Sequence, residues 1–165
     1  MSGITGTAAY MSLAAALAVS TPALSNGCYA RNYSEAHLAE NPVQVVASIR
    51  VKIGVDERYG TLSGVMDVIA ADREDPNSLE NAENTLIQYL HCNEYNGVVK
   101  CSAECDSGLM TILRKDDKAL SFTTKGLIMS RGGEGCSFAL DLAERKGEAT
   151  TYSLDRAVDA ACEGL

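Results

Sequence analysis

The dipeptide Asn96-Gly97, midway between Cys92 and Cys101, constrains the fold more than any other feature of the chain. Asn-Gly is the strongest short signal for a two-residue type I′ hairpin turn, because both central residues need a positive φ. A hairpin closed on this turn places Cys92 opposite Cys101 in a non-hydrogen-bonded pair, where Cα atoms lie ~4.5 Å apart. That separation suits a disulfide. The sequence therefore predicts antiparallel β-structure, a Cys92–Cys101 bond and an oxidising compartment.

The first part of the chain has the composition of an export signal. Residues 1–25 contain no charged side chain and include an apolar run from Ala8 to Val19, followed by a proline and small residues. This pattern is typical of a secretory signal peptide, and the run is too short for a membrane-spanning helix. We therefore expect a signal peptide over 1–25 and one disulfide-stapled domain over 26–165, periplasmic or secreted, with no membrane anchor. The alternative is a buried Ala-rich helix.

Six cysteines lie in the part of the chain that would remain after cleavage. An even set in an exported domain predicts three disulfides. Because the termini of compact domains often lie close together, we expect Cys28 to pair with Cys162. This leaves Cys105 to pair with Cys136. A lipid-modified Cys28 is an alternative, but it would leave an odd number of cysteines.

Apolar periodicity indicates an all-β fold. Apolar residues occupy every second position from Val45 to Val55, and short apolar runs then recur between turn residues, among them a glycine-rich turn at 132–135. Short strands at this spacing predict a small antiparallel meander barrel, with a two-sheet sandwich as the alternative. Short helical turns are expected near both ends, behind Ser34 and over 155–162. The expected strands are 45–55, 62–69, 85–92, 98–103, 109–114, 120–124, 127–130, 137–143 and an edge strand at 150–154.

No residue pattern matches a known catalytic or metal site. His91 and Cys92 are adjacent in a predicted strand, so they point to opposite faces and cannot share a zinc ion with the other cysteines. The other histidine, His37, lies in no nucleophile motif. The acidic segment 72–77 lacks the order of ligands of an EF-hand. We therefore expect no catalytic residue, no cofactor and no metal, and hence no enzyme.

One segment carries a family resemblance. The run from Cys101 through Glu104 and Cys105 to Gly108, followed by short strands and a terminal Cys162, resembles uncharacterised exported bacterial proteins that are rich in cysteine and β-structure. Those proteins carry a Cys-x-x-Glu-Cys-Asp-Gly-Gly segment, and here Ser107 replaces its first glycine. The resemblance extends from Cys28 to Cys162 and implies export and disulfides. It implies no activity.

The charge balance narrows the expected partners. A formal net charge of −8 argues against nucleic acid or an anionic membrane as a partner. We expect a non-enzymatic periplasmic binding module, inhibitor-like or an envelope accessory, that recognises a protein partner through its loops. A basic envelope protein, such as a lysozyme-type enzyme, would be favoured electrostatically. The alternatives are a barrel-type carrier of a small apolar ligand, which needs an apolar cavity with a mouth, and an enzyme of unrecognised class.

Overall fold

The computed structural model describes residues 26–71, 85–131 and 138–165. Four features expected from the sequence lie outside these residues: the signal peptide 1–25, the acidic segment 72–77, the glycine-rich turn 132–135 and the disulfide partner Cys136.

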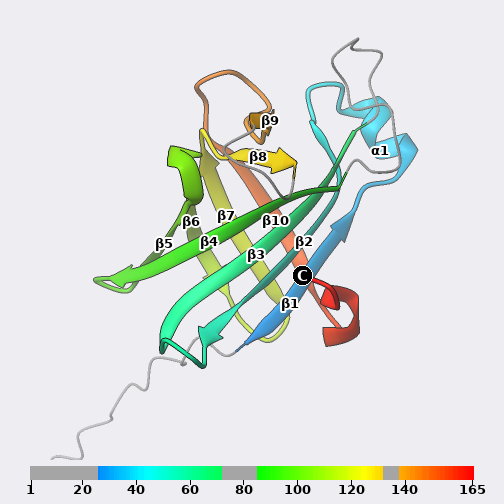
Figure 1. Cartoon of the computed structure of the whole chain (residues 1–165). Helices are drawn as coiled ribbons and strands as arrows, with labels where there is room; N and C mark the ends of the chain where they lie inside the picture. The colour runs from blue at the N-terminus through cyan, green and yellow to red at the C-terminus, as the bar shows by residue number, and fades with distance from the viewer. Residues whose placement is uncertain (1–25, 72–84, 132–137) are drawn as a thin grey trace, which may run out of the picture.

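Eight antiparallel strands form a closed barrel, because the pairing of β3 with β4 joins the two ends of the strand order (Figure 1). Closure gives each of these strands a neighbour on both sides. The predicted all-β barrel is confirmed over the sandwich. The barrel strands are β1 (Gly27–Asn32), β2 (Val46–Asp56), β3 (Thr61–Ala70), β4 (Thr85–Tyr95), β5 (Val98–Ala103), β6 (Leu109–Lys115), β7 (Ala119–Lys125) and β10 (Thr150–Ala157). The remaining elements are α1 (Glu35–Glu40), β8 (Ile128–Arg131), β9 (Phe138–Asp141) and the 3-10 turns η1 (Glu104–Asp106) and η2 (Asp159–Cys162).

The period-two pattern of β2 fills the barrel interior except at both ends of the predicted series, and at its far end Val55 is 45% exposed. Ile49, Val51 and Ile53 are buried, as alternation along a strand requires. Near the start of β2 the register with β3 shifts between Val46 and Ser48. Such an irregularity changes which side chains face inward, so Val46 is fully buried whereas Val45 is only partly buried. The expectation that Val45 continues the inward-facing series was therefore wrong.

The two terminal strands differ from the sequence-based expectation. β1 was not predicted, because Gly27–Asn32 shows no apolar alternation, yet it pairs with both β2 and β10. The segment expected to form an edge strand, β10, lies between β7 and β1 and so closes the barrel. Since β10 extends to Ala157, the last helical turn begins at Asp159 rather than at 155.

One end of the barrel is covered by the segment inserted between β7 and β10. β8 pairs with the beginning of β4 and with β9, at the upper end of the barrel in Figure 1. Leu127, Met129 and Leu142 of this segment are fully buried in the common core. The Tyr152 hydroxyl donates to the Leu142 carbonyl at 2.8 Å, and burial raises the pKa of Tyr152. We call this the covered end.

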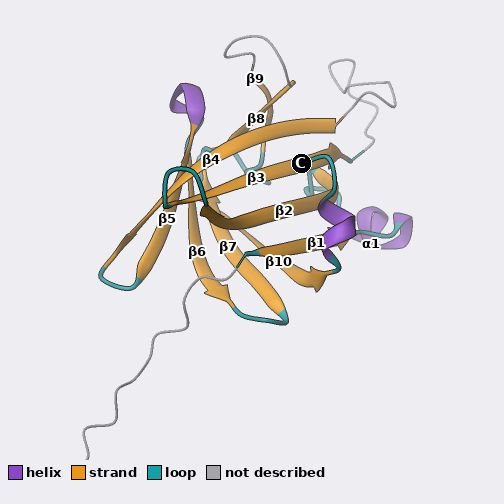
Figure 2. Ribbon diagram, turned by 60° about the horizontal axis from the view of Figure 1, so that its bottom comes forward, coloured by secondary structure: helices purple, strands orange, loops and turns teal. Residues whose placement is uncertain are grey.

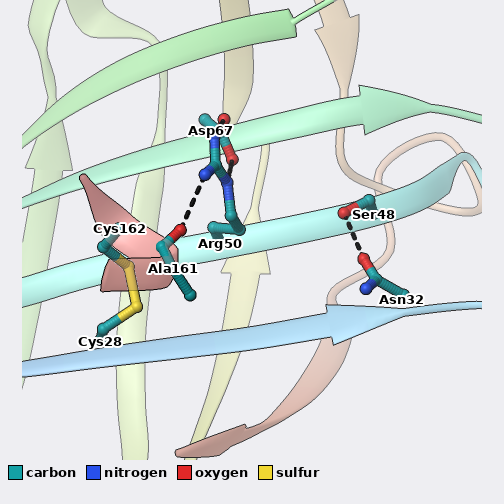
Figure 3. A network of polar contacts seen from close by, with 7 residues as sticks. All are labelled: Cys28, Asn32, Ser48, Arg50, Asp67, Ala161 and Cys162. Atoms are coloured by element: carbon teal, nitrogen blue, oxygen red, sulfur yellow. Dashed lines mark hydrogen bonds and ion pairs between the residues drawn. A yellow bond between two sulfur atoms is a disulfide. The ribbon is translucent and has the colours of Figure 1, made fainter. Parts of the chain in front are cut away.

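The C-terminal segment lies against the outer wall of the barrel and is held there by a disulfide and by a hydrogen bond from Arg50 (Figure 3). Cys28 of β1 is bonded to Cys162 of η2, as predicted. Because its sulfur is occupied by this bond, the same sulfur cannot carry a lipid. Beside it, Arg50 donates to both carboxylate oxygens of the buried Asp67 and to the Ala161 carbonyl at 2.7 Å. Hydrogen bonding to Asp67 raises the pKa of Arg50.

Candidate binding surface at the hairpin end

The β4–β5 hairpin has the geometry that its sequence predicts. Asn96 and Gly97 both have positive φ, 52° and 76°, as a type I′ turn requires. Cys92 pairs with Cys101, and their Cα atoms are 3.9 Å apart across the disulfide. Both cysteines face the interior, whereas His91 is exposed on the outer wall, as strand parity predicts. The disulfide therefore braces the hairpin from its inner face.

This hairpin extends beyond β3 at the end of the barrel opposite the covered end, while β6 remains paired with β5 up to Val99. The ladder between β3 and β4 ends at the pair Ser63–His91, whereas the ladder between β4 and β5 continues to Tyr95–Val98. The last four residues of β4 thus have a partner in β5 but none in β3. Figures 1 and 2 both show the hairpin reaching away from the turn between β2 and β3.

Three exposed apolar side chains cluster at the tip of the hairpin. Tyr95 and Val98 form the pair that flanks the turn and are 78% and 41% exposed. Leu113 of β6 follows directly after the pair Val99–Ile112 and is 59% exposed. We call Tyr95, Val98 and Leu113 the tip surface. A contiguous group of exposed apolar side chains often marks an interaction site.

The sequence analysis located the turn but missed the tip surface. Alternation along the hairpin would have placed Tyr95 and Val98 on the outward face, so the signal for these two was available. The same signal was available for Leu113, because alternation from the inward-facing Met110 and Ile112 places it on the outward face.

The charges beside the tip surface are paired with each other. Arg114 donates to Asp116 at 2.7 Å. Asp116 also accepts from the backbone N–H groups of Lys118 and Ala119, both at 2.8 Å. These hydrogen bonds, that from Lys118 first, lower the pKa of Asp116 to about 2. Hydrogen bonds to Asp116 therefore fix the turn between β6 and β7, and Arg114 and Asp116 neutralise each other there.

Below the hairpin, the end of the barrel is filled by an aromatic ring and two cationic side chains. Tyr29 is 1% exposed, and its hydroxyl donates to the Asp116 carbonyl at 2.9 Å. Lys115 and Arg156 lie over its ring, at 5.9 and 5.4 Å from the centroid. Burial, and then the charge of Arg156, lower the pKa of Lys115.

The rest of the interior is also occupied by large side chains. The rings of Phe122 and Tyr152 lie 5.7 Å apart in the core.

A depression of about 550 Å³ is lined by residues of β2, β3 and the C-terminal segment, among them Lys52, Val65 and Glu163. The largest fully buried side chains are Tyr29, Tyr152, Phe122, Ile49, Ile53, Met66, Leu86, Leu90, Met110, Leu120, Leu127 and Met129.

The histidines singled out by the sequence have local partners. His37 of α1 lies 2.9 Å from the Gln44 amide oxygen and stacks on Tyr33. His91 lies 3.5 Å from the Glu104 carboxylate on the outer wall. Among the described residues, no group of three or more His, Cys, Asp or Glu side chains is arranged to hold a metal ion.

The remaining predicted cysteine pair is described in part. Cys105 is disulfide-bonded, while Cys136, its expected partner, lies outside the described residues. The backbone around Cys105 is unusual, because Cys105 and Asp106 both have positive φ. Gly108 follows with φ +91°, and a Cβ there would lie 1.9 Å from the Gly126 carbonyl oxygen, so only glycine fits.

No helix in the described part of the chain is long and apolar enough to cross a membrane. In comparisons with known proteins, no protein-family model, no curated protein and no solved structure matched this chain.

Proposed function

We propose that this protein is a non-enzymatic binding module that recognises a protein partner in the periplasm or outside the cell. The observation that carries the proposal is the tip surface, which consists of exposed apolar side chains on a disulfide-braced hairpin and on the adjacent strand β6. Tyrosine is enriched among the residues that dominate the energy of protein interfaces. A braced hairpin loses little conformational freedom on binding, so more of its contact energy appears as affinity.

The barrel interior favours this function over the alternative of a small-ligand carrier. A carrier of barrel type needs an internal cavity with a mouth. Here, large side chains occupy the interior positions, and Tyr29 fills the hairpin end. The two disulfides whose cysteines are both among the described residues, one local and one between the ends of the domain, support an oxidising compartment such as the periplasm.

The net charge supports a basic partner. A protein with a formal charge of −8 attracts positively charged proteins over distances longer than a contact. Such attraction accelerates encounter and weakens as salt rises, because the screening length falls to ~8 Å at physiological ionic strength.

The proposal is tested by immobilising the exported chain and passing envelope extract over it at low and at high salt. The control is an unrelated acidic protein of the same net charge. We expect discrete basic proteins to be retained above the control at low salt, and less of each at high salt. Native mass spectrometry of the protein purified from cells completes the test. Retention no higher than the control, together with a bound small apolar molecule, would contradict the proposal in favour of a carrier.

A further inference from the structure

We infer that Asn96 is a site of spontaneous deamidation, that the hairpin turn holds it in an unreactive conformation, and that the Cys92–Cys101 disulfide maintains this protection. The reaction needs only water and the chain itself, so it does not depend on the proposed function.

The chemistry follows from the dipeptide. An asparagine that precedes glycine deamidates readily, because glycine has no side chain to hinder its backbone nitrogen. The Gly97 nitrogen attacks the side-chain carbonyl carbon of Asn96, forming a new C–N bond. The bond from that carbon to the side-chain nitrogen breaks, and this nitrogen leaves as ammonia with the proton that Gly97 loses. Water then hydrolyses the resulting succinimide ring to aspartate or isoaspartate.

Access does not limit this reaction at the hairpin. Asn96 and Gly97 are both exposed, and a Cβ built at Gly97 would meet no atom within 4 Å. Water therefore reaches both reacting groups. Protection has to come from the conformation of the backbone.

The turn keeps the reacting groups apart. Asn96 has φ 52°, and in a type I′ turn, the mirror image of type I, its ψ is about +30°. In this left-handed region the Cβ of a residue lies close to its own carbonyl oxygen. The next nitrogen lies on the opposite side of the carbonyl carbon, so the Gly97 nitrogen faces away from the Asn96 side chain. Ring closure therefore requires the turn to open, which breaks the adjacent pair Tyr95–Val98.

The disulfide restrains this opening. Residues Cys92 to Tyr95 pair with β5 but have no partner in β3, whereas β5 is also held by β6 up to Val99. The end of β4 is thus the arm of the hairpin that can separate. Cys92–Cys101 ties this arm to β5 and closes a short loop, which limits the conformational freedom that opening would release.

Deamidation would make an opening of the hairpin permanent. Isoaspartate carries the backbone through its side chain, so it adds one carbon atom to the turn and removes the two-residue geometry. Aspartate keeps the backbone length but places a negative charge between Tyr95 and Val98. Either product alters the tip surface, so the disulfide protects its covalent structure as well as its shape.

The first experiment compares the folded and the unfolded state of the same chain. The exported protein is incubated at neutral pH without reductant, in buffer and in concentrated urea, and peptide mapping by mass spectrometry follows aspartate and isoaspartate at position 96. We expect the folded chain to react about tenfold more slowly, or less, because only its rare open forms can close the ring. Equal rates would overturn protection by the turn, and no product in urea would overturn Asn96 as a reactive site.

Two disulfide variants then separate local from global opening. Cys92→Ala/Cys101→Ala should deamidate at Asn96 roughly fivefold faster than the parent, or more, because its hairpin opens more often. Cys92→Val/Cys101→Val repeats the test with more of the buried volume filled. The matched control, Cys28→Ala/Cys162→Ala, should leave the rate within about twofold of the parent, because distant sites act independently. A parent-like rate in the folded hairpin variants, or an equal rise in the control, would overturn the role of Cys92–Cys101.

The second Asn-Gly of the chain, Asn26-Gly27, is an internal reference in every sample. The Asn26 side-chain oxygen accepts from the Val55 N–H at 2.8 Å, and Gly27 is buried. Neither feature involves the hairpin, so the rate at Asn26 should be the same in the parent and in the hairpin variants. A parallel rise at Asn26 and Asn96 would show that the whole domain opens, and would likewise overturn the inference.

Discussion

Two disulfides hold two very different regions of this barrel. Cys28–Cys162 joins residues 134 positions apart and fixes the C-terminal segment against the outer wall, beside the buried Asp67. Cys92–Cys101 joins residues only 9 positions apart and braces a hairpin whose tip is exposed. The first disulfide holds the C-terminal segment over the outer wall, whereas the second holds a hairpin whose tip is exposed. The comparison teaches that a disulfide between the ends of a domain chiefly stabilises the fold, while a local one fixes the shape of an element.

The largest expected effect is a difference between the two disulfides in how much each contributes to the free energy of unfolding. In the chain-entropy model, closing the long loop contributes ~5 kcal/mol and closing the short one ~2.7 kcal/mol. The double variant Cys28→Ser/Cys162→Ser should therefore lose more free energy of unfolding in urea than Cys92→Ser/Cys101→Ser. Equal losses would mean that the unfolded chain is too structured for loop length to matter, and the comparison would fail.

The second effect tests whether the C-terminal segment depends on the ion pair beneath it. Asp67→Asn removes the charge that orients Arg50, and should cost ~1.5–3 kcal/mol, since Asp67 is 3% exposed and accepts charged hydrogen bonds. The control is Arg31→Ala at the exposed pair Arg31–Asp155, which should cost less than ~1 kcal/mol. Hydrogen exchange should accelerate around η2 in Asp67→Asn alone. Unchanged hydrogen exchange around η2 would show that the Cys28–Cys162 disulfide alone holds the C-terminal segment in place.

The third effect concerns the turn of the hairpin. Gly97→Ala forces a Cβ into a φ of +76°, which should cost ~1 kcal/mol even though the surrounding space is open. Asn96→Gly in the same turn should change the free energy of unfolding by less than ~0.5 kcal/mol, because glycine adopts positive φ freely. If Gly97→Ala left the free energy of unfolding unchanged, the turn would be able to adopt another conformation.

The smallest effect is the acid response of the turn next to the hairpin. The pKa of Asp116 is lowered from 3.8 to about 2 by its hydrogen bonds. A depressed pKa stabilises the folded state above the unfolded value, and this contribution is lost as pH falls from about 4 towards 2. The difference in unfolding free energy between the parent and Asp116→Asn should therefore shrink over this range. A difference independent of pH would contradict the assigned hydrogen bonds.

The sequence predicted the features that depend on local geometry. The Asn96-Gly97 turn sets the register of β4 and β5, and this register alone pairs Cys92 with Cys101. Alternation in β2 likewise predicted its buried face. These signals lie within a few residues of the structure that they determine.

Features that depend on distant segments were missed or misplaced. β1 has no alternating pattern, because the C-terminal segment buries its outer-facing Cys28. The sequence predicted β10 as an edge strand, because its second neighbour, β1, was not recognised as a strand. In the candidate site, the turn was predicted, but Leu113 lies near it only because β6 pairs with β5, a pairing between separate segments. Closure and register shifts are properties of the assembled sheet.

The most direct test of the account measures binding and stability together in Cys92→Ala/Cys101→Ala. The partner protein retained from envelope extract is purified, and its dissociation rate is measured by biolayer interferometry at 25 °C. The account predicts a barrel that remains folded by circular dichroism but releases the partner at least tenfold faster, while Leu113→Asp has a similar effect without loss of stability. A folded double variant that releases the partner at the parent rate would contradict the claim that this disulfide shapes a binding element.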